Sequence, residues 1–140
     1  KEIKGQQELD EIVLNLDFAP TFLDYAGIKV PKSMQGYSMR NLVSGKKQSK
    51  WRESMYYHYF EFPHGWHFVK KHYGIRTDRY KLIHFYDDID AWEFYDLKND
   101  PNEINNIYND PNYKSEINTT KRELYKLQVE FKDTVIEKTD

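Results

Sequence analysis

The chain has 140 residues, of which 39% are hydrophobic and 16% aromatic, and this is enough apolar material for a folded domain with a core. Its 21 basic and 23 acidic residues are mixed along the sequence and give a formal charge of −2, so we expect no nucleic acid as a partner. The absence of cysteine excludes disulfides and cysteine chemistry from these residues, and no apolar run is long enough for membrane insertion.

The first third of the sequence predicts one short helix, preceded by an apolar run, Ile12 to Leu16, that is short enough for a strand. It opens on KEIKGQQELD without an initiator methionine, and we interpret the chain as a fragment of a longer protein. Asp17 is a suitable N-cap for the helix. The spacing of Phe18, Phe22 and Ala26 predicts one buried helical face, and Gly27 then ends the helix as a C′ residue.

The middle of the sequence predicts strands. MYYHYFEF alternates along one strand, HYGIRTDRYKLIHF predicts two more strands joined by a tight turn at Asp78 and Arg79, and WEFYDL predicts the last strand. The alternation of the two hairpin strands sets their register. Gly74 lies within a strand, and we interpret it as a bulge or as a place where another backbone or a ligand approaches closely.

The C-terminal third predicts a long amphipathic helix. The tetrapeptide NDPN occurs at Asn99 and again at Asn109, and each copy has the features of a helix start. In the first copy, Glu103 completes a capping box with Asp100. Apolar residues recur at helical spacing as far as Val135, so we expect this helix to pack on the sheet.

Four residues near the first hairpin strand are candidates for binding a ligand. The indole of Trp66 can stack on a pyranose ring, His67 and His72 can hydrogen-bond ring hydroxyls, and Arg76 can pair with sulfate or carboxylate oxygens. The alternative is structural: Trp66 covers the sheet and Arg76 forms a salt bridge. His64 and His67 form an HxxH pattern, but a metal site needs further converging ligands, so no metal site is predicted.

Longer segments resemble sulfatases. The stretch LDFAPTFLDYAGIKVPKSMQGYSMRNLVSGK is similar to the end of the catalytic domain in that family, and GIRTDRYKLI and WEFYDLKNDPNEINN are similar to the C-terminal subdomain of bacterial sulfatases, especially N-acetylglucosamine-6-sulfatases. The resemblance implies an α+β fold, with a four-stranded antiparallel sheet packed against a long C-terminal helix. It assigns residues 1–49 to the tail of an N-terminal α/β, alkaline-phosphatase-like catalytic domain and residues 50–140 to the subdomain.

The resemblance also implies a function. Sulfatases hydrolyse sulfate esters with a formylglycine made from Cys or Ser in a C/S-x-P-x-R motif, beside a calcium ion. The sequence lacks that motif. We therefore expect formylglycine and calcium in a missing N-terminal domain, with no catalytic residue, metal ligand or cofactor in this fragment, which alone should be inactive.

The expected role of the fragment is structural, with a contribution to the substrate rim. The implied partners are its own N-terminal domain and a sulfated carbohydrate, such as a glycosaminoglycan carrying 6-O-sulfated N-acetylglucosamine. The implied location is periplasmic or secreted. The alternatives are a free-standing carbohydrate-binding or interaction module and, less favoured, a related hydrolase of the alkaline-phosphatase superfamily.

Overall fold

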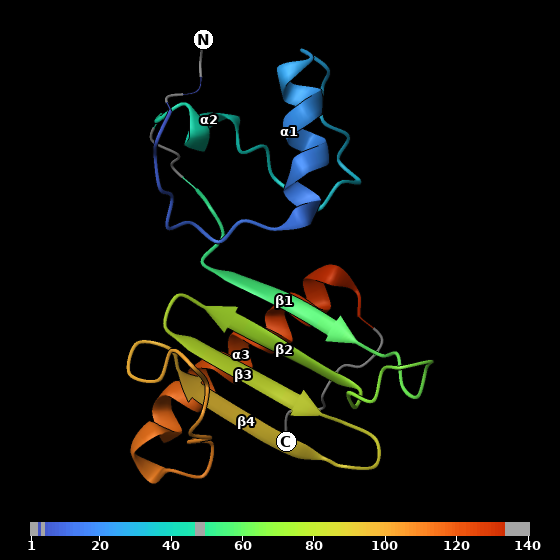
Figure 1. The fold of residues 1–140 in the computed structure, drawn as a ribbon, viewed down its shortest axis with the longest axis vertical. Helices are drawn as coiled ribbons and strands as arrows, with labels where there is room; N and C mark the ends of the chain where they lie inside the picture. Colours follow the sequence, from blue (N-terminus) through green and yellow to red (C-terminus); the bar gives the residue numbers. More distant parts are fainter. Residues whose placement is uncertain (1–2, 4, 47–49, 134–140) are drawn as a thin grey trace. The chain divides into compact units, whose positions relative to one another are not determined.

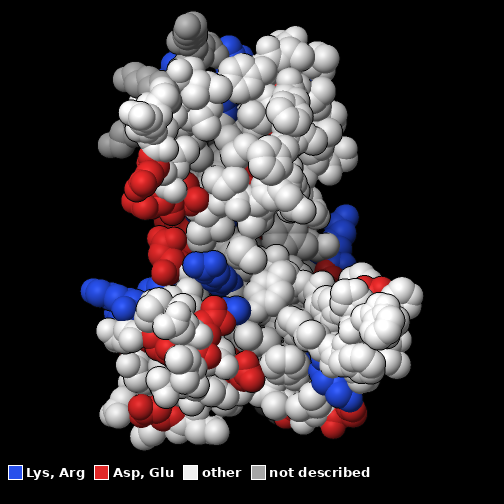
Figure 2. Space-filling model, in the orientation of Figure 1, with Lys and Arg blue, Asp and Glu red and all other residues white. Residues whose placement is uncertain are grey.

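The computed structural model describes residues 3, 5–46 and 50–133, which belong to two compact units, residues 1–53 and 54–140 (Figure 1). The first unit is mainly loop with short helices, and the second is a sheet with one long helix. No helix in the described ranges has the length and apolar character needed to cross a bilayer. In Figure 2 the basic side chains on the visible face stand singly or in small groups, which fits the mixed charge of the sequence.

The first unit contains a 3₁₀ helix, Asn15–Asp17, followed by α1, Phe18–Tyr25, and α2, Arg40–Val43. The strand expected at Ile12 to Leu16 is wrong, because the chain is irregular there and then enters the 3₁₀ helix. The predicted end of α1 is confirmed, because Gly27 has a φ of 72° and the N–H of Ile28 returns to the carbonyl of Leu23. Asp17 occupies the N-cap position, but its side chain makes no capping bond to α1.

The predicted buried face of α1 is wrong. Phe18 is 50% exposed and Phe22 is 68% exposed, and Ala26 is also exposed. The helix instead buries its opposite side, where the hydroxyl of Thr21 accepts the N–H of Met39. Helical spacing identified an apolar stripe correctly, but no described residue of this unit covers it.

The second unit is built on a four-stranded antiparallel sheet in the order β1-β2-β3-β4, which confirms the predicted architecture. The strands are β1, Ser54–Tyr59; β2, His72–Thr77; β3, Tyr80–Phe85; and β4, Ala91–Asp96. The β2–β3 turn lies at Asp78 and Arg79, as predicted.

One face of this sheet is covered by α3, Lys114–Phe131, which lies behind the sheet in Figure 1. The core combines sheet and helix side chains: Tyr73, Ile75, Leu82, Phe94, Ile117, Leu124 and Leu127. The predicted packing of an amphipathic C-terminal helix on the sheet is therefore confirmed. Val135, the last residue of the predicted pattern, lies outside the described residues.

The two NDPN copies behave differently. In the second copy, Asp110 accepts the N–H of Asn112 and opens a 3₁₀ turn, Pro111–Tyr113, that leads into α3. The first copy forms a turn, so its predicted helix start is wrong. The chain there must return to the edge of β4, where the side chain of Asn106 and the N–H of Ile107 complete the hydrogen bonds of Phe94. A helix would carry these groups away from the sheet.

Gly74 sits in a continuous register, opposite Tyr57 on β1 and Ile83 on β3, so the strand has no bulge there. A Cβ atom at this position would lie 2.5 Å from the hydroxyl of Tyr57 and 2.6 Å from the carbonyl oxygen of Leu82. The close approach that the sequence indicated is therefore made by a side chain of the neighbouring strand. Glycine is needed because the ring of Tyr57 occupies the space.

Candidate functional site

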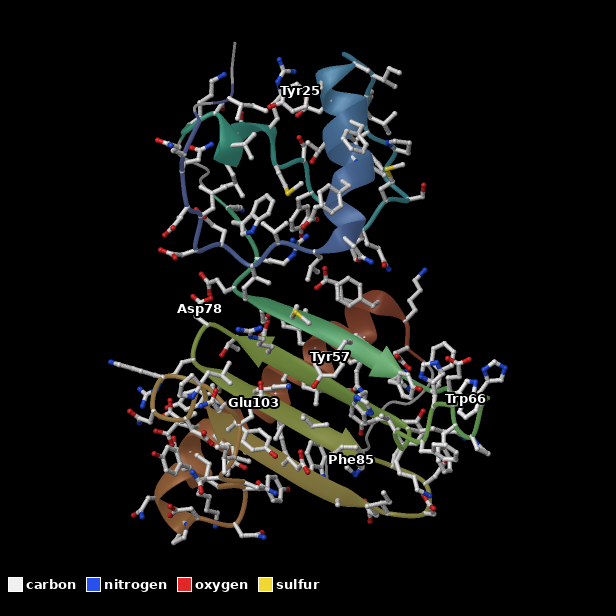
Figure 3. All side chains as sticks on the ribbon, viewed as in Figure 1. Tyr25, Tyr57, Trp66, Asp78, Phe85 and Glu103 are labelled. Atoms are coloured by element: carbon white, nitrogen blue, oxygen red, sulfur yellow. The ribbon has the colours of Figure 1, made fainter. Side chains whose placement is uncertain are left out.

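The sheet has a second face, opposite α3, that we call the open face. Successive residues of a strand point to opposite sides, so the residues that alternate with the core lie here. Figure 3 shows Tyr57 and Phe85 on this face, which is turned toward the viewer. Its main side chains are Tyr57, Tyr59, His72, Arg76 and Phe85.

His72 begins β2, and its ring is held from several directions. The ring of Tyr59 stacks on it at 5.4 Å between centroids, while Phe85 lies at 5.1 Å and Tyr57 meets it edge-on at 5.9 Å. Its Nδ1 lies 2.8 Å from the carbonyl oxygen of Lys70. These contacts leave the imidazole little rotational freedom.

Two tyrosine hydroxyls close to His72 are buried. The hydroxyls of Tyr57 and Tyr59 are enclosed and have no hydrogen-bond partner in the described structure. Burial raises the pKa of Tyr57 well above its ordinary value. Burial and a hydrogen bond to Glu93 likewise raise the pKa of Tyr95, on the same face, to about 12.

Trp66 and His67 lie outside the sheet, on a loop of residues 60–71 that we call the aromatic loop. A tight turn between His64 and His67 brings Trp66 to the tip, where 94% of its surface is exposed (Figure 3). The alternative in which Trp66 covers the sheet is therefore wrong. At its base, Lys70 pairs with Asp88 at 2.6 Å and Lys71 with Asp87 at 2.8 Å.

Arg76 lies on the open face two residues beyond Gly74 and is exposed. It forms no salt bridge with any described residue, so the structural alternative for this arginine fails within the described ranges. His72 and Arg76 thus share one strand and one face. No hydrogen bond or ring contact of the described part of the chain joins either of them to Trp66 or His67.

The first unit contains a buried ion pair that sequence reasoning missed. Both terminal nitrogens of Arg52 bind the carboxylate of Asp17, which also accepts the N–H groups of Leu14 and Tyr37. Burial of Asp17 opposes its ionisation, but the hydrogen bonds from Arg52 and the backbone outweigh this effect and lower its pKa. Asp17 thereby ties three separate segments together. The sequence signal available was only its position at a helix start.

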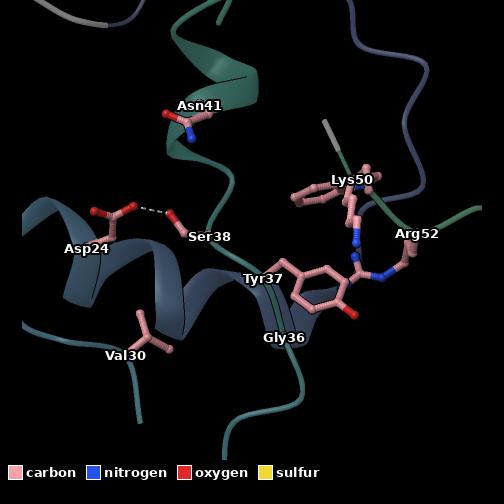
Figure 4. Close-up of a pocket in the computed structure, with 9 residues that line it drawn as sticks. Asp24, Val30, Gly36, Tyr37, Ser38, Asn41, Lys50 and Arg52 are labelled. Carbon is pink, nitrogen blue, oxygen red and sulfur yellow. Dashed lines mark hydrogen bonds between the residues drawn. The ribbon is translucent and has the colours of Figure 1, made fainter. Parts of the chain in front are cut away.

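A hollow of about 510 Å³ lies in the same unit (Figure 4). Its wall includes the ring of Tyr37, with the guanidinium of Arg52 4.7 Å from the ring centroid, and the hydrogen bond of 2.5 Å from Ser38 to Asp24. The lining residues are Asp24, Val30, Gly36, Tyr37, Ser38, Asn41, Lys50, Trp51 and Arg52. Its charged groups mainly form ion pairs within the unit: Arg52 pairs with Asp17, and Asp24 pairs with Arg40.

Comparison with known proteins gives this geometry a context. Residues 1–130 match the family described as N-sulphoglucosamine sulphohydrolase, C-terminal. The chain belongs to this family. The predicted relation to sulfatases is thereby confirmed, and the sheet and helix described above are those of a sulfatase C-terminal region.

Individual relatives are also sulfatases. The chain is 47% identical to an N-acetylglucosamine-6-O-sulfatase of Bacteroides thetaiotaomicron over 95% of its length, and 32% identical to an arylsulfatase of Clostridium perfringens over 89%. It spans 24% of the length of each of these relatives. A solved structure of a protein in complex with its substrate D-glucosamine-2-N,6-O-disulfate superposes with a TM-score of 0.81 and 46% identity, over 89% of this chain and 25% of that one.

Proposed function

We propose that this chain is the C-terminal region of a sulfatase that hydrolyses sulfate esters of sulfated glycans, with 6-O-sulfated N-acetylglucosamine in a glycosaminoglycan as the favoured substrate. The observation that carries this proposal is the 47% identity to an N-acetylglucosamine-6-O-sulfatase across nearly the whole chain. A related structure that holds a disulfated glucosamine supports the same substrate class.

The proposal divides the chain in two. Residues 1–49 form the tail of an α/β catalytic domain, and residues 50–140 form the C-terminal subdomain. The exposed apolar side chains of the first unit, such as Phe22 at 68% and Ile28 at 56%, support this division, because a larger domain would cover them. The change of compact unit after residue 53 supports a boundary in this region.

The nucleophile and the metal belong to the missing domain in this proposal. The sequence has no Cys and no Ser-x-Pro-x-Arg segment from which a formylglycine is made. Within the described ranges no three His, Asp or Glu side chains gather as metal ligands. The parent protein would act in the periplasm or after secretion.

The open face and the aromatic loop form the substrate rim in this proposal. His72 is the main candidate for contact because its ring is held rigidly, and Arg76 adds a cation that pairs with no described carboxylate. Trp66 and His67 add an exposed indole and imidazole on the adjacent loop. These residues would orient the glycan while the missing domain performs the hydrolysis.

Kinetics of the full-length protein test the proposal. Replacing His72 with Ala should raise the KM for 6-O-sulfated N-acetylglucosamine roughly tenfold, as expected for one lost hydrogen bond, with folding intact. Lys126→Ala is the control, because Lys126 lies on α3, on the other side of the sheet from the rim, and most of its side chain is exposed. The 140-residue chain alone should show no turnover. Turnover by this chain, or unchanged kinetics of His72→Ala, would contradict the proposal.

The alternative is a free-standing carbohydrate-binding module, which the exposure of Trp66 favours. The two functions differ in what the gene encodes. A C/S-x-P-x-R segment several hundred residues upstream would establish the sulfatase, whereas a gene that encodes only this region would establish the binding module.

A further inference from the structure

The hydrogen bond of His72 determines which of its nitrogens carries the proton. A backbone carbonyl only accepts hydrogen bonds, so the 2.8 Å contact with the oxygen of Lys70 requires a proton on Nδ1. In a neutral imidazole the other nitrogen, Nε2, then carries a lone pair and no proton. His72 is therefore held in one tautomer by the backbone.

The Nε2 atom of His72 is available to a ligand. It has no hydrogen-bond partner within the described ranges, where the ring's polar contact is the one made by Nδ1. The enclosed side-chain atoms without partners are the hydroxyls of Tyr57 and Tyr59 and one oxygen of Glu116, and Nε2 is not among them. Nε2 therefore keeps some exposed surface, on a ring whose orientation Tyr59 and Phe85 fix.

An unprotonated Nε2 accepts hydrogen bonds, and this determines which groups of a ligand can bind to it. Sulfate and carboxylate oxygens only accept hydrogen bonds and carry negative charge, so they repel an unprotonated nitrogen. Hydroxyl, amine and amide N–H groups donate to it. On the same face, Arg76 offers the opposite chemistry, because a guanidinium only donates and carries positive charge.

We propose that His72 is a specificity-determining acceptor, which binds a hydroxyl or N–H group of the sugar through Nε2 and does not bind its sulfate. Tyr59, Phe85 and the carbonyl of Lys70 act as positioning groups that set the tautomer and the ring orientation. This inference rests on the proposed function for the sugar itself, but the tautomer is a property of the chain alone.

The first experiment uses the 140-residue chain with nitrogen-15 in its histidines. At about pH 8, above the usual titration range of histidine, a long-range proton–nitrogen correlation spectrum should show His72 protonated at Nδ1 and unprotonated at Nε2. The spectrum of His72→Gln identifies the signal by its loss. A proton on Nε2 would overturn the inference and leave the proposed sulfatase function untouched.

The second experiment compares two amides in the full-length protein, with 6-O-sulfated N-acetylglucosamine as the probe. Gln places its amide oxygen near the position of Nε2, whereas Asn reaches only the position of Nδ1. His72→Gln should keep KM within about threefold, and His72→Asn should raise KM roughly tenfold, or about 1.4 kcal/mol. An Asn variant as good as Gln would overturn the acceptor role. Wild-type KM in both variants and in His72→Ala would overturn the rim function itself.

Discussion

At the scale of single residues, β1 places two neighbouring tyrosines in opposite situations. The hydroxyl of Tyr56 points to the α3 side and donates to Asp133 at 2.6 Å, whereas the hydroxyl of Tyr57 is enclosed on the open face without a partner. A buried hydroxyl without a partner lowers the stability of the fold, because it has lost its hydrogen bonds to water and forms none in the protein. The two side chains therefore contribute to stability in different ways.

This difference leads to a paired prediction. Tyr57→Phe should leave the free energy of unfolding unchanged or raise it by up to about 1 kcal/mol, because it removes an unpaired polar atom. Tyr56→Phe should lower it by about 1.5 to 3 kcal/mol, because the hydroxyl binds a carboxylate. Urea denaturation of both variants measures the effect. An equal loss in both would mean that the Tyr57 hydroxyl has a partner, such as a bound water.

Residue-level features were only partly predictable from the sequence. Gly74 was recognised as a close approach, but that Tyr57 fills the space depends on the pairing between strands that are far apart in sequence. Asp17 was recognised as a helix start, yet its carboxylate binds Arg52, 35 residues away. Local spacing contains no information on such partners, because folding brings them together.

At the scale of elements, the strands and α3 were predictable because their apolar periods are strong and local. The first NDPN segment was not, since Asp100 and Pro101 fit both a helix start and the turn that returns to β4. The tertiary hydrogen bonds of Asn106 and Ile107 decide between the two. The four-stranded antiparallel sheet was predicted from the family resemblance, which contains three-dimensional information that periodicity lacks, whereas the order of the strands comes from the structure.

The packing of α3 predicts that substitutions at different positions of this helix have very different effects on stability. Leu124 is 2% exposed in the core, whereas Val129 is 50% exposed. Leu124→Asp should abolish the cooperative thermal transition of the sheet unit, because it buries an unpaired charge in an apolar core. Phe131→Asp should lower the midpoint of this transition, because Phe131 is partly buried against the core and stacks on Tyr56. Val129→Asp should change the free energy of unfolding by less than about 0.5 kcal/mol. A normal melt for Leu124→Asp, followed by circular dichroism, would refute this packing.

At the scale of the whole molecule, the two units differ in how they bury apolar side chains. The sheet unit has a contiguous core, whereas α1 presents Phe18 and Phe22 stacked on each other at 6.4 Å with half or more of each exposed. A surface of this kind indicates contact with another structure. In our proposal that structure is the missing catalytic domain.

A double variant tests this assignment. Phe18→Ser with Phe22→Ser should leave the melting temperature of the isolated chain unchanged and reduce its aggregation. In the full-length protein the same change should cost about 3 kcal/mol or more, because each buried Phe contributes about 1.5 to 3 kcal/mol. Ala19→Ser, on an exposed position of α1, is the control. Calorimetry that finds the full-length double variant as stable as the control would place this face outside any domain contact.

The Asn106 segment has a consequence for association between molecules. Its amide accepts the N–H of Phe94 at 3.0 Å and donates to the carbonyl of Trp92 at 3.1 Å, so a side chain stands where a fifth strand would pair. Free strand edges are templates for aggregation, and this edge is already occupied. Growth of the sheet by addition of a foreign strand is therefore blocked at β4.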